Sequence, residues 1–163
     1  MSRQTYKLLV DYIQNNQERF YRVAYTYCKS REDALDIVQE TVYKALKSHK
    51  SIQTDYLEAW FYRILINTSL SFLRKRKEVI PFNIKTMDVP YEERTYLDLY
   101  DAIDHLKAED KTLIILRFFE DLKLTDIASI LKLNVNTVKT RLYKILKQLK
   151  LELEWEETYE STL

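Results

Sequence analysis

Apolar residues recur at helical spacing along most of this chain. In residues 4–28 they predict two helices, divided at Asn15-Asn16. The positions expected to face a core there are Leu9, Ile13, Phe20, Val23, Ala24 and Tyr27. Ser30 and Asp33 have the spacing of a capping box, so the next helix is expected from Ser30 to about Lys47. Its inner face is expected to carry Leu35, Val38, Val42 and Leu46.

A polar, irregular segment over residues 48–55 interrupts this pattern. A long helix is then predicted from about Tyr56 to Arg76. Apolar spacing turns one set of its side chains toward a core: Leu57, Trp60, Phe61, Ile64, Leu65 and Thr68. Residues 78–95 lose the periodicity and hold both prolines of the chain, so they predict a linker. Further helices are predicted over about 96–107, 110–120, 125–131 and 135–152.

The composition favours helices over strands. The chain has 163 residues, no glycine and only two prolines, which leaves little of the turn chemistry that β-hairpins need. We expect an all-α fold with two small helical domains joined by a flexible linker. The expected division is a first domain over 1–77, the linker over 78–95, a second domain over 96–152 and an acidic tail over 153–163.

Two short stretches with apolar residues at helical spacing, separated by a tight turn, lie within residues 124–144. The first places Leu124, Ile127, Ala128 and Leu131 at i, i+3, i+4 and i+7. The second forms an inward stripe of Val135, Val138, Leu142, Ile145, Leu146 and Leu149. Thr125 is expected to cap the first helix, and Asn134 or Asn136 the second. This pattern is typical of a helix-turn-helix, although the glycine common in such turns is missing.

The outward face of the second predicted helix carries basic residues and no acidic residue. Its side chains are Asn136, Thr137, Lys139, Thr140, Tyr143, Lys144 and Lys147. Lysines neutralise phosphates, and asparagine and threonine can hydrogen-bond base edges or phosphates, so the face favours DNA binding. The alternative is a solvated lysine face on an ordinary helix hairpin. The coincidence of turn, stripe and acid-free face favours DNA.

The distribution of charge and the few cysteine and histidine residues limit the classes of function that we expect. The net charge is only +1, but bases gather at 74–77 and 139–150, and glutamates follow in the tail. One cysteine, Cys28, and two separated histidines predict no disulfide, metal site or other cofactor. We find no catalytic constellation and expect no enzyme. No membrane span or signal peptide is evident, so we expect a cytoplasmic protein.

Three blocks of sequence together resemble a known family. EDALDIVQETVYKAL (32–46), AWFYRILINTSLSFLRKR (59–76) and EDLKLTDIASILKLNVNTVKTRLYKILKQLK (120–150) are similar to regions 2.1–2.2, 2.3–2.4 and 4.1–4.2 of extracytoplasmic-function sigma factors. The resemblance implies an alternative sigma factor that binds core RNA polymerase and directs promoter-specific initiation in an envelope stress response. It also implies a membrane-anchored anti-sigma factor as a partner.

The resemblance implies roles for individual residues. Contact with the clamp helices of the large polymerase subunit falls to Asp33, Asp36, Gln39 and Glu40, and the second domain is expected to meet the flap. Asp36 and Glu40 share a helical face; for Asp33, simple helix capping is an equal alternative. For Gln39 and Glu40 the alternative is a solvated face.

The single-stranded −10 element is assigned by the same resemblance to the first domain. Asn67 and loop 48–55 would hold a flipped base. Tyr56 and Tyr62 are expected to be exposed aromatics, whereas the spacing of Trp60 favours a core position over the alternative of a stacking platform for a base. Phosphate contacts are expected from Arg63, Arg74, Lys75, Arg76 and Lys77. The alternative for the basic run is that it complements the dipole of its own helix end.

The −35 element is assigned to the second domain. The resemblance points to Lys139, Thr140, Tyr143 and Lys144, with Arg141 nearer the DNA backbone. The chain departs from the family in having Asn136 where glycine is usual, and Lys107 where proline is usual. Two other function classes remain as hypotheses. One is a free-standing, dimeric helix-turn-helix regulator; the other is a helical adaptor or anti-sigma partner that binds no DNA.

Overall fold

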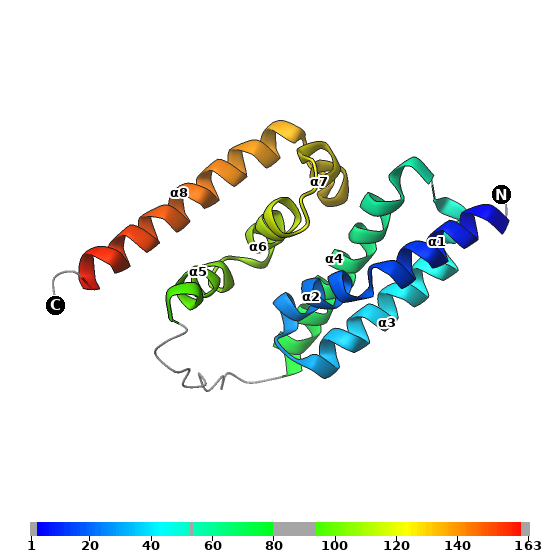
Figure 1. Ribbon diagram of the computed structural model, residues 1–163, viewed down its shortest axis with the longest axis horizontal. Helices are drawn as coiled ribbons and strands as arrows, with labels where there is room; N and C mark the ends of the chain where they lie inside the picture. Colours follow the sequence, from blue (N-terminus) through cyan, green and yellow to red (C-terminus); the bar gives the residue numbers. More distant parts are fainter. Residues whose placement is uncertain (1–2, 53, 80–93, 161–163) are drawn as a thin grey trace. The chain divides into compact units, whose positions relative to one another are not determined.

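The chain folds into helices that form two compact units (Figure 1). The structure, a computed structural model, describes residues 3–52, 54–79 and 94–160. No strand occurs within these ranges. The first unit is built from α1 to α4 and the second from α5 to α8. The expectation of an all-α protein with two helical domains is confirmed.

In the first unit the elements follow the predicted breaks. They are α1 (Arg3–Asn15), α2 (Gln17–Cys28), α3 (Arg31–Lys47), two 3₁₀ turns η1 (His49–Ser51) and η2 (Thr54–Tyr56), and α4 (Leu57–Val79). The Ser30 hydroxyl oxygen accepts the backbone N–H of Asp33 at 3.4 Å, as expected for the start of α3. Lys29 closes α2 in a left-handed conformation, with φ of 55°.

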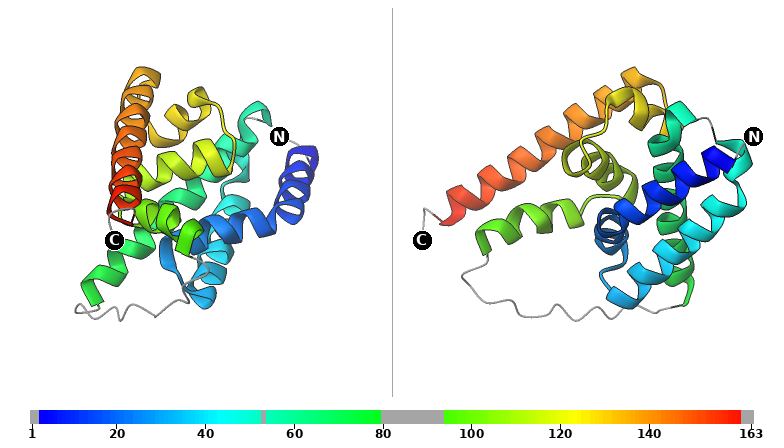
Figure 2. Two further views of the ribbon diagram at one scale, coloured as in Figure 1. Left: turned by 60° about the vertical axis from the view of Figure 1, so that its left-hand side comes forward. Right: turned by 45° about the vertical axis from the view of Figure 1, so that its right-hand side comes forward.

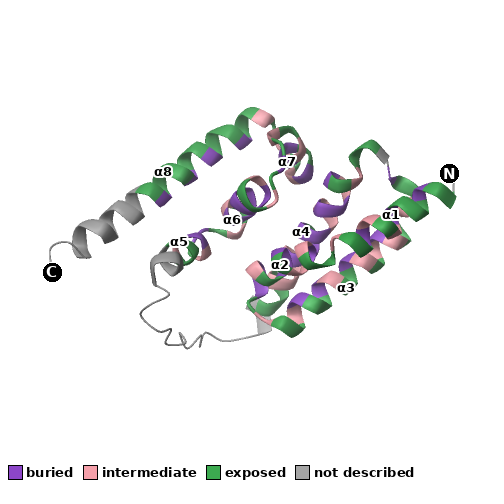
Figure 3. Cartoon of the chain, viewed as in Figure 1, coloured by how far each residue is buried: buried purple, intermediate pink, exposed green. Residues whose placement is uncertain are grey.

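The core of the first unit is largely aromatic where α1, α2 and α4 meet. All six core positions predicted in residues 4–28 are buried (Figure 3). The Phe20 and Phe61 ring centroids lie 4.3 Å apart, and Tyr12 meets Phe61 edge-on at 5.6 Å. Tyr62 packs edge-on against Phe20 and is 0% exposed. The prediction that Tyr62 is an exposed aromatic is therefore wrong.

The predicted inner face of α3 is also wrong. The buried side chains are Ala34, Ile37, Thr41 and Ala45. Leu35 is 46% exposed, and Val38, Val42 and Leu46 are half-buried. The helix α3 packs against both α2 and α4, and small residues on the buried face allow this close approach. The larger apolar residues therefore turn outward.

Helix α4 buries a face that only partly matches the prediction. Phe61, Leu65 and Thr68 are buried as expected, but Leu57, Trp60 and Ile64 are only half-buried. The buried set is completed by Ala59, Tyr62, Ile66 and Ser69. The buried face is thus rotated by part of a turn, because Tyr62 and Ile66 point into the core.

The second unit consists of α5 (Arg94–Asp104), α6 (Ala108–Ile114), the π-helical turn η4 (Ile115–Phe119), α7 (Leu124–Leu131) and α8 (Val135–Glu160). Both α5 and α6 pack on α8. An ion pair of 3.0 Å between Lys111 and Asp104 ties α6 to the end of α5. Helix α8 extends into the predicted acidic tail, and residues 161–163 lie outside the described ranges.

The predicted linker falls mostly outside the described residues. Its first residues belong to α4, which reaches Val79, and its end overlaps α5, which begins at Arg94. Residues 80–93 lie between them, outside the described ranges. None of the described helices is both long enough and apolar enough to cross a membrane.

Candidate functional site

The turn between α7 and α8 is closed without glycine. Lys132 takes the left-handed conformation, with φ of 55°, and the Leu133 N–H donates to the Ala128 carbonyl at 2.9 Å. A non-glycine residue in this conformation costs about 1–2 kcal/mol. Helix α7 begins at Leu124, one residue before the predicted cap Thr125. The Asn134 side-chain oxygen accepts the Asn136 N–H at 2.9 Å, so Asn134 provides the cap of α8.

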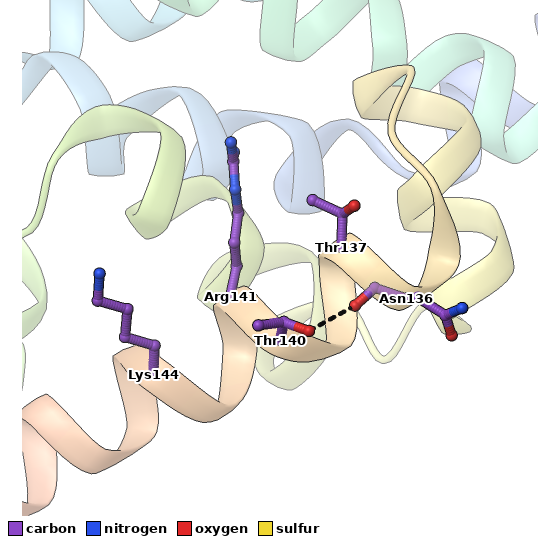
Figure 4. Close-up of a pocket in the computed structure, with 5 residues that line it drawn as sticks. All are labelled: Asn136, Thr137, Thr140, Arg141 and Lys144. Carbon is purple, nitrogen blue, oxygen red and sulfur yellow. Dashed lines mark hydrogen bonds between the residues drawn. The ribbon is translucent and has the colours of Figure 1, made fainter.

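The turn presents one face of α8 to solvent. Every residue predicted for this face is exposed: Asn136, Thr137, Lys139, Thr140, Tyr143, Lys144 and Lys147. Arg141 is exposed as well, and it lines a shallow hollow together with Asn136, Thr137, Thr140 and Lys144 (Figure 4). The opposite stripe is buried at Val138, Leu142, Ile145 and Leu149. Leu146, expected to point inward, is 41% exposed, and Val135 is half-buried.

The α8 face is positively charged and offers hydrogen-bonding groups along its length. The bases are Lys139, Arg141, Lys144, Lys147 and Lys150, and residues 134–150 contain no acid. The Thr140 hydroxyl donates to the Asn136 carbonyl at 2.9 Å, which leaves the hydroxyl oxygen able to accept (Figure 4). Among the large hydrophobic residues described, Tyr143 is the most exposed, at 78%. Such a face can bind phosphates and base edges.

One candidate residue at the end of η2 and three on α4 fall on one open face. Tyr56, Arg63, Asn67 and Arg74 are separated by seven, four and seven residues, which is two, one and two helical turns. Tyr56, Asn67 and Arg74 are exposed and Arg63 is half-buried. The half-buried Trp60 belongs to the same face, because it lies four residues after Tyr56 and three before Arg63. The sequence favoured a core position for Trp60 over a stacking position, and the structure leaves it half-buried.

The basic end of α4 is tied to its neighbours. The Arg76 guanidinium donates to the Cys28 carbonyl at 2.8 Å and lies 3.8 Å from the Asp33 carboxylate. The Asp33 carboxylate therefore lies close to a basic side chain of its own chain, Arg76. Arg74 and Lys75 are exposed, and the side chain of Lys77 lies outside the described residues.

The open face of α3 combines acids with apolar residues. Asp36, Gln39 and Glu40 are exposed, and Glu40 pairs with Lys44 at 3.0 Å. Lys44 also donates to the Thr68 hydroxyl on α4 at 3.3 Å. Leu35, Val42 and Leu46 lie along the same face, at spacings of seven and four residues. The sequence interpretation missed this apolar stripe because it placed these residues inside.

The described residues offer no metal site. No group of three or more His, Cys, Asp or Glu side chains there could hold an ion. Burial raises the pKa of the Cys28 thiol, and a smaller opposing effect comes from a backbone hydrogen bond at Ser30. A buried thiol of raised pKa is a poor nucleophile at neutral pH. The exposed surfaces described above offer charge, hydrogen-bonding groups and apolar contact.

Comparison with known proteins agrees with the presence of two helical units in this chain. Sigma-70 region 2 matches residues 12–79, and sigma-70 region 4 matches residues 96–149. RNA polymerase sigma factor SigV of Bacillus subtilis (strain 168) is 46% identical over 157 residues, covering 91% of this chain and 93% of SigV.

Two solved structures share the fold. One is the sigma factor RpoE bound to the anti-sigma factor NepR from Bartonella quintana, with a TM-score of 0.69 and 24% identity. The match covers 88% of this chain and 97% of RpoE. The other is CnrH bound to the cytosolic domain of CnrY, with a TM-score of 0.71 and 18% identity, covering 93% of each chain.

Proposed function

The chain belongs to the extracytoplasmic-function sigma factors of the sigma-70 family, and from this premise we propose which of its surfaces carry out each step of initiation. A sigma factor of this family binds core RNA polymerase and directs it to a promoter. The work divides into holding the polymerase, reading one duplex element and holding one melted element.

The −35 element is assigned to the α8 face. The observation that carries the proposal is the exposed face of α8 in the second helix of a helix-turn-helix, where residues 135–150 contain no acid. In such motifs the second helix enters the major groove with its N-terminal residues at the base edges. Asn136, Thr137 and Thr140 lie in the first two turns of α8, so we assign them to bases. Phosphate contacts and the outer groove are assigned to Lys139, Arg141, Tyr143, Lys144 and Lys147.

The polymerase surface is assigned to the open face of α3. An apolar centre rimmed by polar groups is the usual anatomy of a protein interface. Here Leu35, Val42 and Leu46 supply the apolar strip, and Asp36, Gln39 and Glu40 supply the polar edge. Asp33 belongs to this proposal through its position on α3, although its carboxylate lies by Arg76. The partner surface is a basic and apolar helix pair, as the clamp helices are expected to be.

The melted −10 strand is assigned to the open face of α4. Tyr56 and Trp60 offer aromatic surface for unpaired bases, and Asn67 offers an amide for a base edge. Arg63, Arg74 and Lys75 offer charge to the backbone. Tyr62 has no part in this surface, because it is buried.

One experiment tests the function as a whole. Purified protein is mixed with bacterial core polymerase and a random promoter library, and the bound and transcribed sequences are selected. We expect two spaced motifs to be enriched only when core polymerase is present. Enrichment of a single palindrome without polymerase would support the dimeric regulator. No enrichment of any motif would support the adaptor that binds no DNA.

Regulation by an anti-sigma factor forms part of the proposal. RpoE, which shares the fold, was solved with the anti-sigma factor NepR, and CnrH was solved with the cytosolic domain of CnrY. We extend this to a membrane-anchored inhibitor that covers the α3 and α8 surfaces of this chain in the cytoplasm and releases it under envelope stress. Co-purification of the chain with a membrane protein from unstressed cells, lost on envelope stress, is the expected result.

A further inference from the structure

Helix α2 carries two tyrosines and two bases on its outward face. Tyr21, Arg22, Tyr25 and Lys29 occupy positions i, i+1, i+4 and i+8 of the helix and its cap, so they lie on one side. The opposite side of α2 is buried in the core. Tyr25 is 40% exposed, Arg22 and Lys29 are exposed, and Tyr21 is half-buried.

The two tyrosine rings form one platform. Their centroids lie 6.0 Å apart, and their planes are inclined by only 31°. Arg22 makes no salt bridge within the described part of the chain. Glu18 is the one acid of α2, and it lies in the first turn, where the helix dipole favours a carboxylate. The remaining turns of this face therefore present aromatic surface beside positive charge.

The C-terminal end of α2 adjoins the end of α4 at Arg76. The Arg76 guanidinium reaches the Cys28 carbonyl at 2.8 Å, so the end of α4 lies against the end of α2 (Figure 1). Lys29 directly follows Cys28, and the exposed Arg74 and Lys75 directly precede Arg76. The ends of α2 and α4, each with basic residues, therefore lie together within the first unit, where the two helices pack (Figure 2).

We propose that the α2 face of Tyr21, Arg22, Tyr25 and Lys29 binds single-stranded DNA. This inference rests on the proposed function of the first unit, which is to hold the melted −10 strand. Aromatic side chains stack on unpaired nucleobases of any sequence, and neighbouring Lys and Arg side chains neutralise the phosphates of the DNA backbone. A duplex keeps its base faces covered by stacking, so the platform suits a melted strand rather than the −35 duplex.

The test compares two double variants in the full chain bound to core polymerase. Tyr21→Ala with Tyr25→Ala removes both rings, whereas Tyr21→Phe with Tyr25→Phe keeps them. Binding to labelled oligo-dT is measured by fluorescence anisotropy, with core polymerase alone as the blank. We expect the alanine pair to weaken binding by about tenfold or more and the phenylalanine pair to bind as the wild type does. Tyr100→Ala, in an exposed tyrosine of α5 in the second unit, is the matched control and leaves binding unchanged.

Salt dependence tests the two bases separately. Arg22→Gln with Lys29→Gln removes two phosphate contacts, so the slope of log K against log salt concentration falls by about 1.4 for a single strand. An unchanged slope contradicts the assignment. Unchanged oligo-dT affinity in the alanine pair overturns the proposal. An equal loss in the phenylalanine pair does so too, because stacking does not need the hydroxyls.

Two further readouts separate this inference from others. Loss of core binding by the alanine pair, at unchanged thermal stability, identifies the face as a protein interface and overturns the proposal. Tighter binding to oligo-rU than to oligo-dT, lost in the alanine pair, assigns the face to RNA instead. Promoter selection reports on the proposed function itself: if two motifs are enriched but the alanine pair binds oligo-dT normally, only the α2 inference fails.

Discussion

The strongest quantitative prediction concerns the lysines of α8. Lys139 and Lys144 are both exposed on the acid-free face, and each is assigned one phosphate. For duplex DNA, each neutralised phosphate contributes about 0.9 to the slope of log K against log salt concentration. Lys139→Gln with Lys144→Gln therefore lowers that slope by about 1.8. Between about 50 and 200 mM salt, the wild type loses roughly tenfold more affinity than the variant.

The assay measures binding of the polymerase complex to labelled −35 duplex over a series of salt concentrations. The matched control is Lys7→Gln with Lys107→Gln, which removes the same charge at exposed positions outside the α8 face. Its slope is expected to equal that of the wild type. Core binding is measured in parallel, and it stays unchanged in both variants. A slope that is the same in the α8 variant and the wild type refutes the phosphate assignment; a parallel loss of core binding refutes the division of labour between the units.

Three further predictions follow from burial and exposure. Leu35→Asp weakens core binding by about tenfold or more, since it puts a charge into the proposed apolar strip. Leu8→Asp on α1, equally exposed at 46%, leaves core binding intact in a pull-down titration, and equal affinities of the two variants contradict the α3 assignment. Tyr62→Ala lowers the free energy of unfolding of the first unit by about 3–5 kcal/mol in urea titration, whereas Tyr56→Ala changes it by less than about 0.5; similar values for both contradict the burial of Tyr62. Asn67→Ala reduces promoter opening, followed by permanganate reactivity of unpaired thymines, without affecting duplex binding; unchanged opening removes Asn67 from the −10 surface.

The helix-turn-helix could be predicted in detail from the sequence because its pattern is unambiguous. In α8 the apolar residues form one stripe with polar residues on every other side, so only one orientation buries it. Val138, Leu142 and Ile145 are buried as predicted. Leu146 extends the apolar stripe by one position, and the sequence could not reveal that the fold leaves it exposed. The turn itself needed the structure, since Lys132 takes a conformation usually left to glycine.

The orientation of α3 could not be predicted, because two stripes compete along it. Ala34, Ile37, Thr41 and Ala45 have the same helical spacing as the larger residues one position further on. Size favours burying the larger set, since it removes more apolar area from water. Close packing against two neighbouring helices favours the smaller set, and that is the arrangement adopted. A similar ambiguity affects Trp60, Phe61 and Tyr62, where three consecutive aromatics must point in three directions.

Contacts between residues of different candidate sites could not be predicted from the sequence. Sequence analysis assigned Asp33 to the polymerase and Arg76 to DNA as independent residues, yet the two side chains lie 3.8 Å apart. Likewise Glu40, assigned to the polymerase, pairs with Lys44, which in turn donates to Thr68 beside Asn67. An acid that engages a basic partner helix must share or give up its internal base. The affinity of each surface therefore includes the cost of loosening a contact to the other, so single substitutions at Asp33 or Arg76 act on both surfaces.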